Sequence, residues 1–372
     1  MEGPSHGLAR ISPIKVAKNN RWVERSLRYF ITSNLVLMTS YTATALENRG
    51  ESDSDARAAF QLYQEGRFEE ALSKAQEGLT LAPTAKWPHV LLGHSYSQQG
   101  RYEEAVAAFQ KAIQLDPQAS DAYGGLGIVY ERQDRRDEAM EMYQKAIDVD
   151  GGYYGTYLDL ARLYSAQGQL EETERLCREA LRRNPKSYEA YECLGRIHHG
   201  RGNTKKAIAE FKQAIAANPK SATAYDALGT IYSDLGQKDK AIVFLRRAVE
   251  CDPTHVHAHY NLGTAYMESN RYALAIPEFQ AVVKLQPEAA DAHKLLGFAH
   301  YKRGEYDGAI AACQEALRLD PKNPQIIDVH KIIGSAYVNK GEKANAQREY
   351  EQLRSINEEW AQELKKKIDT MP

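Results

Sequence analysis

The stretch Ala222–His255, ATAYDALGTIYSDLGQKDKAIVFLRRAVECDPTH, decides the fold because variants of it fill most of the chain. The proline in its last turn recurs every 34 residues, and only Gly151 breaks the series. The positions in this register are Pro83, Pro117, Pro185, Pro219, Pro253, Pro287 and Pro321. A fixed period of this length indicates a solenoid of stacked repeats, in which each unit packs against its neighbours.

Each 34-residue unit is expected to form two helices. In both halves of the unit, apolar and aromatic residues fall at helical spacing, and Gly236 separates the halves. The first-helix face comprises Tyr225, Leu228, Gly229 and Tyr232, and the second-helix stripe comprises Ala241, Leu245 and Ala248. Asp252-Pro253 ends the second helix because proline lacks an N–H and disfavours helical geometry in the preceding residue. The small residues Gly229 and Ala241 allow the two backbones to approach closely.

This pattern resembles the tetratricopeptide repeat in its period and in its residue types. A leucine-glycine pair recurs on the first helix as Leu92-Gly93, Leu126-Gly127, Leu194-Gly195, Leu228-Gly229, Leu262-Gly263 and Leu296-Gly297. The small residue of the second helix recurs as Ala71, Ala105, Ala139, Ala207, Ala241, Ala275 and Ala309. The resemblance implies an all-α fold, a right-handed superhelical solenoid of helix-turn-helix repeats with a C-terminal capping helix.

The repeat register divides the chain into three parts. Residues 1–50 form an N-terminal leader, residues 51–360 hold nine repeat units, and residues 361–372 form the end of the capping helix and the tail. The polar stretch Glu349–Ile368 is expected to be one extended helix. It ends in Lys365-Lys366-Lys367, and cations of this kind are suited to a helix C-terminus.

The leader combines basic residues with a moderately apolar run, Tyr29–Ala45, which ends in the A-x-A pattern Ala43-Thr44-Ala45. These features are typical of a secretory signal that is cleaved before Leu46, although polar residues dilute the run. The run is too short and too polar for a convincing transmembrane helix. The alternative is a disordered or amphipathic leader on a cytoplasmic protein, and membrane association through the leader stays open. We slightly favour an exported, periplasmic location.

The charge distribution argues against nucleic acid as a partner. The first 50 residues carry seven Lys/Arg and three Asp/Glu, so the remaining 41 basic and 47 acidic residues give that part a net charge of -6. A mildly acidic array lacks the basic footprint that nucleic acid requires. The sequence also lacks phosphate-binding, nucleophile-elbow and zinc-protease motifs. We therefore expect no enzyme activity, no cofactor and no small-molecule substrate.

Cysteine and histidine are residue types that can bind metals, but in this sequence both have structural interpretations. The four cysteines show no paired spacing, and Cys177 and Cys313 occupy a second-helix position that is phenylalanine in other units, so buried thiols are expected there. His255 and His259 would lie four residues apart on a helix and could share a metal. However, His259 holds the packing position of Tyr225, and no further ligand follows at suitable spacing. We therefore predict no metal site.

In members of this repeat family, the first helices line a concave groove that holds a partner peptide or helix. The resemblance places five positions of each unit in this groove, and towards the C-terminal end these positions become aromatic and apolar. The predicted partner-binding residues are His257, Tyr260, Met267, Lys294, Phe298, Tyr301 and Lys302. Large apolar side chains on an open face with a charged rim are typical of binding hot spots. The alternative is that some of them pack on the neighbouring helix.

The resemblance also bears on the kind of partner. Chaperone-binding members share a carboxylate clamp of paired lysine and asparagine positions, but here Lys294 is followed by Phe298 and Lys331 by Ser335. A chaperone C-terminal tail is therefore not expected. We predict a non-catalytic adaptor or scaffold that binds a protein or peptide. The alternatives are an envelope assembly or secretion factor and a self-assembling homo-oligomer, whereas an enzyme with attached repeats is disfavoured because no stretch of enzyme-domain length remains.

Overall fold

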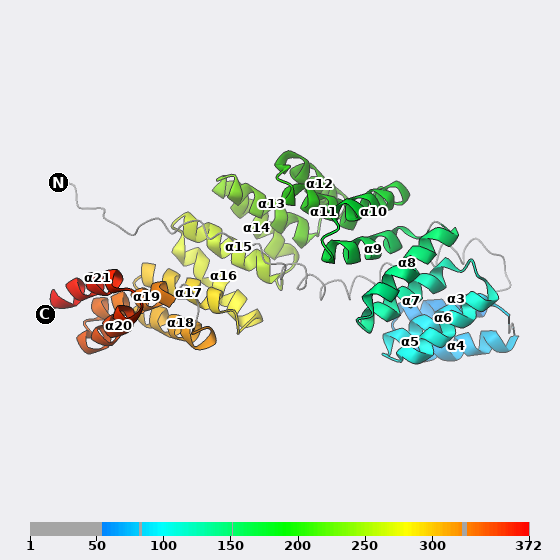
Figure 1. Cartoon of the computed structure of the whole chain (residues 1–372), viewed down its shortest axis with the longest axis horizontal. Helices are drawn as coiled ribbons and strands as arrows, with labels where there is room; N and C mark the ends of the chain where they lie inside the picture. Colours follow the sequence, from blue (N-terminus) through cyan, green and yellow to red (C-terminus); the bar gives the residue numbers. More distant parts are fainter. Residues whose placement is uncertain (1–53, 82–83, 151, 322–325, 372) are drawn as a thin grey trace. The chain divides into compact units, whose positions relative to one another are not determined.

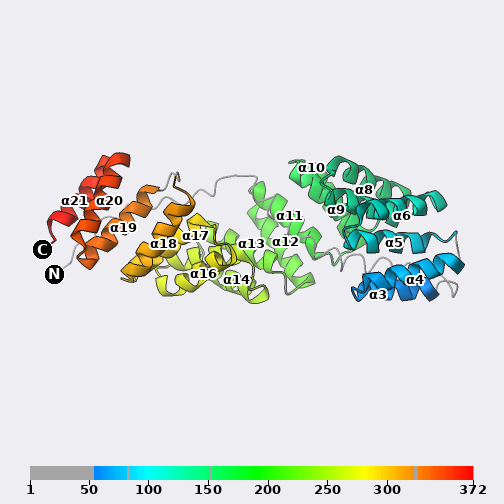
Figure 2. The same ribbon diagram turned by 90° about the horizontal axis from the view of Figure 1, so that it is seen from below.

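The computed structural model describes residues 54–81, 84–150, 152–321 and 326–371. In these ranges all regular secondary structure is helical, and consecutive helices lie side by side in pairs (Figures 1 and 2). The predictions made for the leader, residues 1–50, fall outside the described residues. Within the described ranges, no helix combines the length and the apolar composition that crossing a membrane requires.

The helices alternate between the first and the second helix of successive repeats. The first helices are α3 (Ser54–Gln64), α5 (Lys86–Gln98), α7 (Ser120–Arg132), α9 (Tyr154–Ala166), α11 (Tyr188–Gly200), α13 (Ala222–Asp234), α15 (Val256–Glu268), α17 (Ala290–Lys302) and α19 (Ile326–Lys340). The second helices are α4 (Phe68–Leu81), α6 (Tyr102–Leu115), α8 (Arg136–Asp150), α10 (Leu170–Arg183), α12 (Thr204–Ala217), α14 (Lys238–Cys251), α16 (Tyr272–Leu285), α18 (Tyr306–Leu319) and α20 (Lys343–Ile356). The last helix is α21 (Glu358–Asp369). This all-α arrangement of helix pairs confirms the predicted fold class.

The chain divides into two compact units, residues 1–190 and 191–372, and the boundary falls within α11. From α3 to α10 in unit 1 and from α12 to α21 in unit 2, each helix packs against the next one along the chain. First helices of successive repeats also contact one another, α3 with α5 and α5 with α7 in unit 1, and α13 with α15 and α17 with α19 in unit 2. Because first helices approach one another in this way, their shared side lies on the inside of each unit's curvature. We call this side the concave face.

The close approach predicted from the small residues is confirmed in α13 and α14. Ala241 is fully buried, and a Cβ added to Gly229 would overlap Leu245 and lie 3.3 Å from the carbonyl oxygen of Ala241. The turn between the helices contains Gly236 with φ +71°, a left-handed conformation that glycine adopts without strain. Asp252 then leaves the helical conformation at the end of α14, as the following proline predicts. The same contacts between a first-helix glycine and a second-helix side chain recur along the array.

Two glycine substitutions should therefore change stability in opposite directions. A Cβ at Gly297 would overlap the Cys313 sulfur and lie 3.1 Å from the Ala309 carbonyl oxygen, so Gly297→Ala should destabilise unit 2 by about 1–3 kcal/mol. At Gly124 the added Cβ would meet only Thr156 Oγ1 at 3.9 Å, so Gly124→Ala should stabilise the helix by up to about 1 kcal/mol. Denaturant unfolding followed by circular dichroism measures both. Equal effects of the two substitutions would contradict the close-packing interpretation.

The C-terminal end departs from the prediction in one respect. The prediction of one continuous helix over Glu349–Ile368 is wrong, because α20 ends at Ile356 and α21 begins at Glu358. Asn357 lies between them with an extended backbone, and its side-chain oxygen accepts a hydrogen bond from the Trp360 N–H at 3.1 Å. Asparagine in this role is a helix N-cap, and it starts a separate helix. Helix α21 packs against α19 and α20, buries Ala361, Leu364 and Ile368 and leaves most of its polar side chains exposed, as a capping helix does.

Candidate functional site

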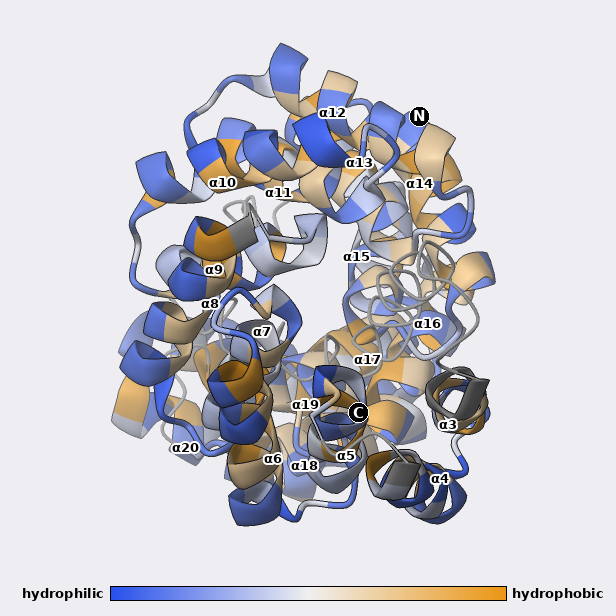
Figure 3. Ribbon diagram, turned by 90° about the vertical axis from the view of Figure 1, so that its right-hand side faces the viewer, coloured by the Kyte–Doolittle hydropathy of each residue, from blue (hydrophilic) through white to orange (hydrophobic). Residues whose placement is uncertain are grey.

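The predicted partner-binding residues lie on two first helices of unit 2. His257, Tyr260 and Met267 belong to α15, and Lys294, Phe298, Tyr301 and Lys302 belong to α17. Figure 3 colours the ribbon by the hydropathy of each residue, and hydrophobic residues, in orange, are prominent near α17. The exposure of the seven side chains differs widely, and it decides which of them a partner could reach.

Tyr260 and Met267 are partly buried and pack against the core of unit 2. The Tyr260 ring meets the fully buried Phe279 edge-on, with the ring centroids 6.0 Å apart. Burial raises the pKa of the Tyr260 hydroxyl to about 12, and the negative charge of Asp291 adds to this rise. Tyr260 therefore has a packing role between the two helices of its repeat, α15 and α16, and exposes only part of its side chain.

Phe298 and Tyr301 also pack partly against the core, in the cluster that α17 forms with α18 and α19. The Phe298 ring lies edge-on to Tyr272 of α16, with centroids 6.3 Å apart, and the Lys302 ammonium lies 5.4 Å from the Phe298 ring centroid. The Tyr301 hydroxyl accepts a hydrogen bond from Asn339 Nδ2 at 3.4 Å. Lys302 is exposed, so this part of α17 combines half-buried aromatic rings with an accessible cation.

Lys294 and His257 occupy different environments. Lys294 is only 9% exposed, and its ammonium lies 3.2 Å from Asp291 Oδ1. It is therefore a buried, paired cation and not part of an exposed rim. His257 is exposed at the start of α15, and its ring centroid lies 6.3 Å from that of His255. Of the two predicted flanking lysines, only Lys302 is freely accessible.

The histidine cluster has structural roles. His255 precedes α15, and its Nδ1 accepts a hydrogen bond from the Ala258 N–H at 3.1 Å. His259 Nδ1 lies 2.6 Å from Glu278 Oε2, and its Nε2 lies 3.0 Å from the Pro253 carbonyl oxygen. Both ring nitrogens face acceptors, and the hydrogen bond to Glu278 raises the pKa of His259. Within the described residues, no group of three His, Cys, Asp or Glu side chains could hold a metal ion.

The two cysteines predicted to be buried thiols differ. Cys313 carries a free, fully buried thiol, and burial raises its pKa to about 12. The reactive thiolate form is therefore disfavoured at neutral pH. Cys177 is buried as well, but it is disulfide-bonded, so the prediction of a thiol is wrong at that position.

The structure adds a buried carboxylate to the concave face of unit 2. Asp226 of α13 is only 4% exposed, and its Oδ1 accepts a hydrogen bond from Asn261 Nδ2 at 2.8 Å. Burial raises the pKa of Asp226, while the nearby His255 and His257 lower it. The repeat register of the sequence places Asp226 and Tyr260 at the same position of successive repeats. It does not show that the Asp226 carboxylate is buried.

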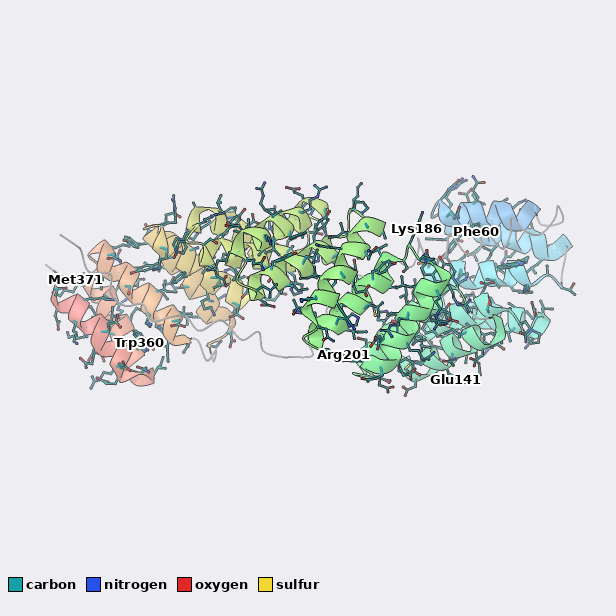
Figure 4. All side chains as sticks on the ribbon, turned by 90° about the horizontal axis from the view of Figure 1, so that it is seen from above. Phe60, Glu141, Lys186, Arg201, Trp360 and Met371 are labelled. Atoms are coloured by element: carbon teal, nitrogen blue, oxygen red, sulfur yellow. The ribbon has the colours of Figure 1, made fainter. Side chains whose placement is uncertain are left out.

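Lys331 illustrates how the end of the array is closed. Its ammonium lies 3.1 Å from the centroid of the Trp360 ring, and Trp360 belongs to α21 at the C-terminal end (Figure 4). Burial lowers the pKa of Lys331. Lys331 thus joins the last repeat to the capping helix by a cation–π contact.

Comparison with protein families identifies the repeat. Two models of the tetratricopeptide repeat match residues 198–262 and 260–324. A model of the C-terminal domain of cilia and flagella-associated protein 70 matches residues 52–227. Comparison with curated proteins finds no match.

Several solved structures are similar to this chain. The APC/C hetero-tetramer Cut9-Hcn1 is similar with a TM-score of 0.54 and 18% identity, covering 78% of this chain and 57% of that chain. This chain thus spans little more than half the length of that relative, and the similarity concerns the fold. MamA is 28% identical over 48% of this chain and 96% of that chain, with a TM-score of 0.43. YrrB, a tetratricopeptide repeat protein with an unusual peptide-binding site, is 23% identical over 50% of this chain and 96% of that chain, with a TM-score of 0.42.

Proposed function

This chain belongs to the tetratricopeptide repeat family, whose repeats generally act as protein-interaction scaffolds, and we propose that the concave face of unit 2 binds a segment of a partner protein. The scaffold is non-catalytic in this proposal, because binding requires only the shape and side chains of the first helices. The segment lies across α15 and α17, where half-buried aromatic side chains line the face.

The observation that carries the proposal is the combination of side chains on α17. Phe298 and Tyr301 are held in place by Tyr272 and Asn339, yet both keep part of their surface exposed beside the accessible ammonium of Lys302. Aromatic side chains that are already ordered lose little conformational entropy on binding, and binding hot spots are rich in them. A partner segment with an apolar side chain followed by a carboxylate fits this arrangement.

Tyr301→Ala combined with Lys302→Glu should reduce the capture of the native partner at least tenfold. Each change removes an accessible contact and leaves the more deeply packed Tyr260 in place, so loss of binding is separated from loss of folding. The full chain and the double variant serve as baits in native extract, and the bound proteins are quantified by mass spectrometry.

A matched control places two changes on an exposed surface of the same unit. Val243→Ala and Lys240→Glu lie on the second helix α14, where Val243 is 65% exposed, and they should leave the capture unchanged. Circular dichroism should give the same helical content for all variants. A partner that is retained by the α17 variant, or lost equally from the α14 control, would contradict binding on the concave face.

A further inference from the structure

Helix α16 is apolar on its outer face as well as on the inner face that it buries in the core of unit 2. The exposed or partly exposed apolar residues of the outer face are Ala273, Leu274, Pro277, Ala281 and Leu285, and we call them the α16 ridge. The two leucines are 49% and 39% exposed. A helix that is apolar all round is typically covered on every side.

The other second helices differ from α16 in this respect. Four members of the ridge, Ala273, Pro277, Ala281 and Leu285, form a row at intervals of four residues. Each of the other second helices that the structure describes has at least one charged residue in the corresponding row. The position of Ala281 is Lys111 in α6, Lys145 in α8 and Arg247 in α14, and these three residues are exposed. The uncharged row is therefore particular to α16 and is not required by the repeat fold.

The row is symmetric about its middle, between Pro277 and Ala281. If the α16 helix of a second copy packs antiparallel on the ridge, Ala273 of one copy lies beside Leu285 of the other, and Pro277 lies beside Ala281. Rows of residues four apart interdigitate in the commonest class of helix packing, with the axes crossing at about −50°. Small side chains opposite larger ones allow such a close approach. The ridge thus complements a second copy of itself.

The charges at the two ends of α16 suit the same arrangement. Arg271 precedes the helix and Glu288 follows it, and both residues are exposed. Within one chain Arg271 contacts Asp239, whose side chain is 87% exposed. An antiparallel pair brings Arg271 of one copy to the end where Glu288 of the other lies, and it also opposes the two helix dipoles. Opposite charges at the rim of an interface favour one orientation over the other.

The available area indicates a weak contact. Helix α16 has 14 residues and is therefore about 21 Å long. The flanking second helices add Val243 of α14, which is 65% exposed, and Ala311 of α18, which is also exposed, both at the repeat position of Pro277. With helices about 10 Å apart, this surface amounts to about 400–600 Å² on each copy. Stable interfaces begin at about 600 Å² on each partner, so we expect a reversible dimer with a dissociation constant on the order of micromolar.

We propose that the α16 ridge is a dimerisation surface, on which a second copy of this chain packs its own α16 antiparallel. The ridge belongs to a second helix, whereas the concave face belongs to the first helices, so dimerisation leaves the concave face of each copy accessible. The proposal does not rest on the proposed function.

Ala281→Lys tests this surface in the full chain. The repeat accepts lysine here, as Lys111 and Lys145 show, so helical content by circular dichroism should not change. Sedimentation equilibrium over about 1–100 μM should show the wild-type mass rising from one chain towards two. The variant should need at least a tenfold higher concentration to associate, because the dimer would bury an unpaired charge. Ala209→Lys is the matched control, since it adds the same charge to an exposed position of α12, two repeats away, and should associate as wild type does.

A mixture of two variants tests the antiparallel arrangement. Pro277→Glu alone should also weaken association, and α8 accepts glutamate at this position, as Glu141. In an equimolar mixture with Ala281→Lys, the new carboxylate of one copy lies beside the new ammonium of the other. The mixture should therefore form dimers at concentrations at which each variant alone does not.

Four results would overturn the proposal. The wild-type chain could remain a single chain up to about 100 μM, it could form species larger than two chains, Ala281→Lys could associate as strongly as wild type, or the mixed variants could fail to pair. None of these results bears on partner capture by α17. Conversely, loss of the partner proposal leaves the sedimentation measurements unchanged, so the two can fail separately.

Discussion

Phe279→Ala should lower the free energy of unfolding of unit 2 by about 3–5 kcal/mol, more than the other single substitutions considered above. Phe279 is fully buried in α16, and its ring fills the space opposite Gly263 and edge-on to Tyr260. Removing the ring takes away its transfer free energy and leaves a cavity between α15 and α16, which the short helices can close only in part. Stability is measured by urea unfolding followed by circular dichroism.

Leu274→Ala provides the control on the same helix. Leu274 is 49% exposed, so its truncation removes little buried area and should change the unfolding free energy by less than about 1 kcal/mol. In a repeat array each unit contacts only its neighbours, so amide exchange should increase first in the helices that contact α16. If the two substitutions destabilise the protein equally, Phe279 is not the main packing residue of the α15–α16 pair.

The consequence for binding follows from the same contact. Tyr260 packs against Phe279, so loss of the phenylalanine ring also removes a support of the concave face. Phe279→Ala should therefore weaken partner capture without touching a surface residue, whereas Leu274→Ala should not. Core packing and binding are coupled here because the first helices contribute side chains both to the core and to the concave face.

The sequence predicted the helix pairs well, because the repeat register depends on local residues. Gly229, Ala241 and Gly236 each have one physical role, and the structure confirms close approach at the first two and a left-handed turn at the third. The break at Asn357 was missed, since one asparagine in a polar helical stretch does not reveal that its side chain caps a new helix. Local composition is ambiguous where one hydrogen bond decides between continuing and restarting a helix.

The candidate site was harder to predict than the fold. Asp226, Tyr260 and Lys294 occupy one position in three successive repeats, yet they form a buried carboxylate, a packed ring and a buried ion pair. Their different burial depends on the side chains beside them in their own repeat, such as Phe279 beside Tyr260 and Asp291 beside Lys294. The period identifies which residues share a face, but the depth of each residue depends on neighbouring side chains that differ from one repeat to the next.

Unit 1 contains a buried charge network whose balance leads to a prediction about pH. Arg162 of α9 forms an ion pair with Glu131 of α7, and its Nη2 lies 3.5 Å from Asp159 Oδ1. Burial raises the pKa of Asp159 from 3.8 to about 6, Arg162 opposes the rise, and Glu131 adds to it. One arginine thus faces two carboxylates, and the ionised form of Asp159 is poorly compensated.

Asp159→Asn should accordingly stabilise unit 1 at neutral pH, by up to about 3 kcal/mol, which is the free energy that corresponds to a rise from 3.8 to about 6. The folded state binds the Asp159 proton more tightly than the unfolded state does. The contribution of Asp159 to stability is therefore fully present below about pH 4 and is lost as the pH rises through about 6. Urea unfolding at pH 4 and pH 7 should show a gain for the variant at pH 7 and little difference at pH 4.

Asp137→Asn tests whether the loss of any carboxylate would stabilise unit 1 at pH 7. Asp137 is exposed in the first turn of α8, where a negative charge interacts favourably with the helix dipole, so its loss should destabilise unit 1 by about 0.5 kcal/mol. The two substitutions remove the same charge and should act in opposite directions at pH 7. An Asp159→Asn variant that is less stable than wild type at both pH values would show that Arg162 requires both carboxylates. In that case the network would stabilise unit 1 as a whole, and Asp159 would not be its strained member.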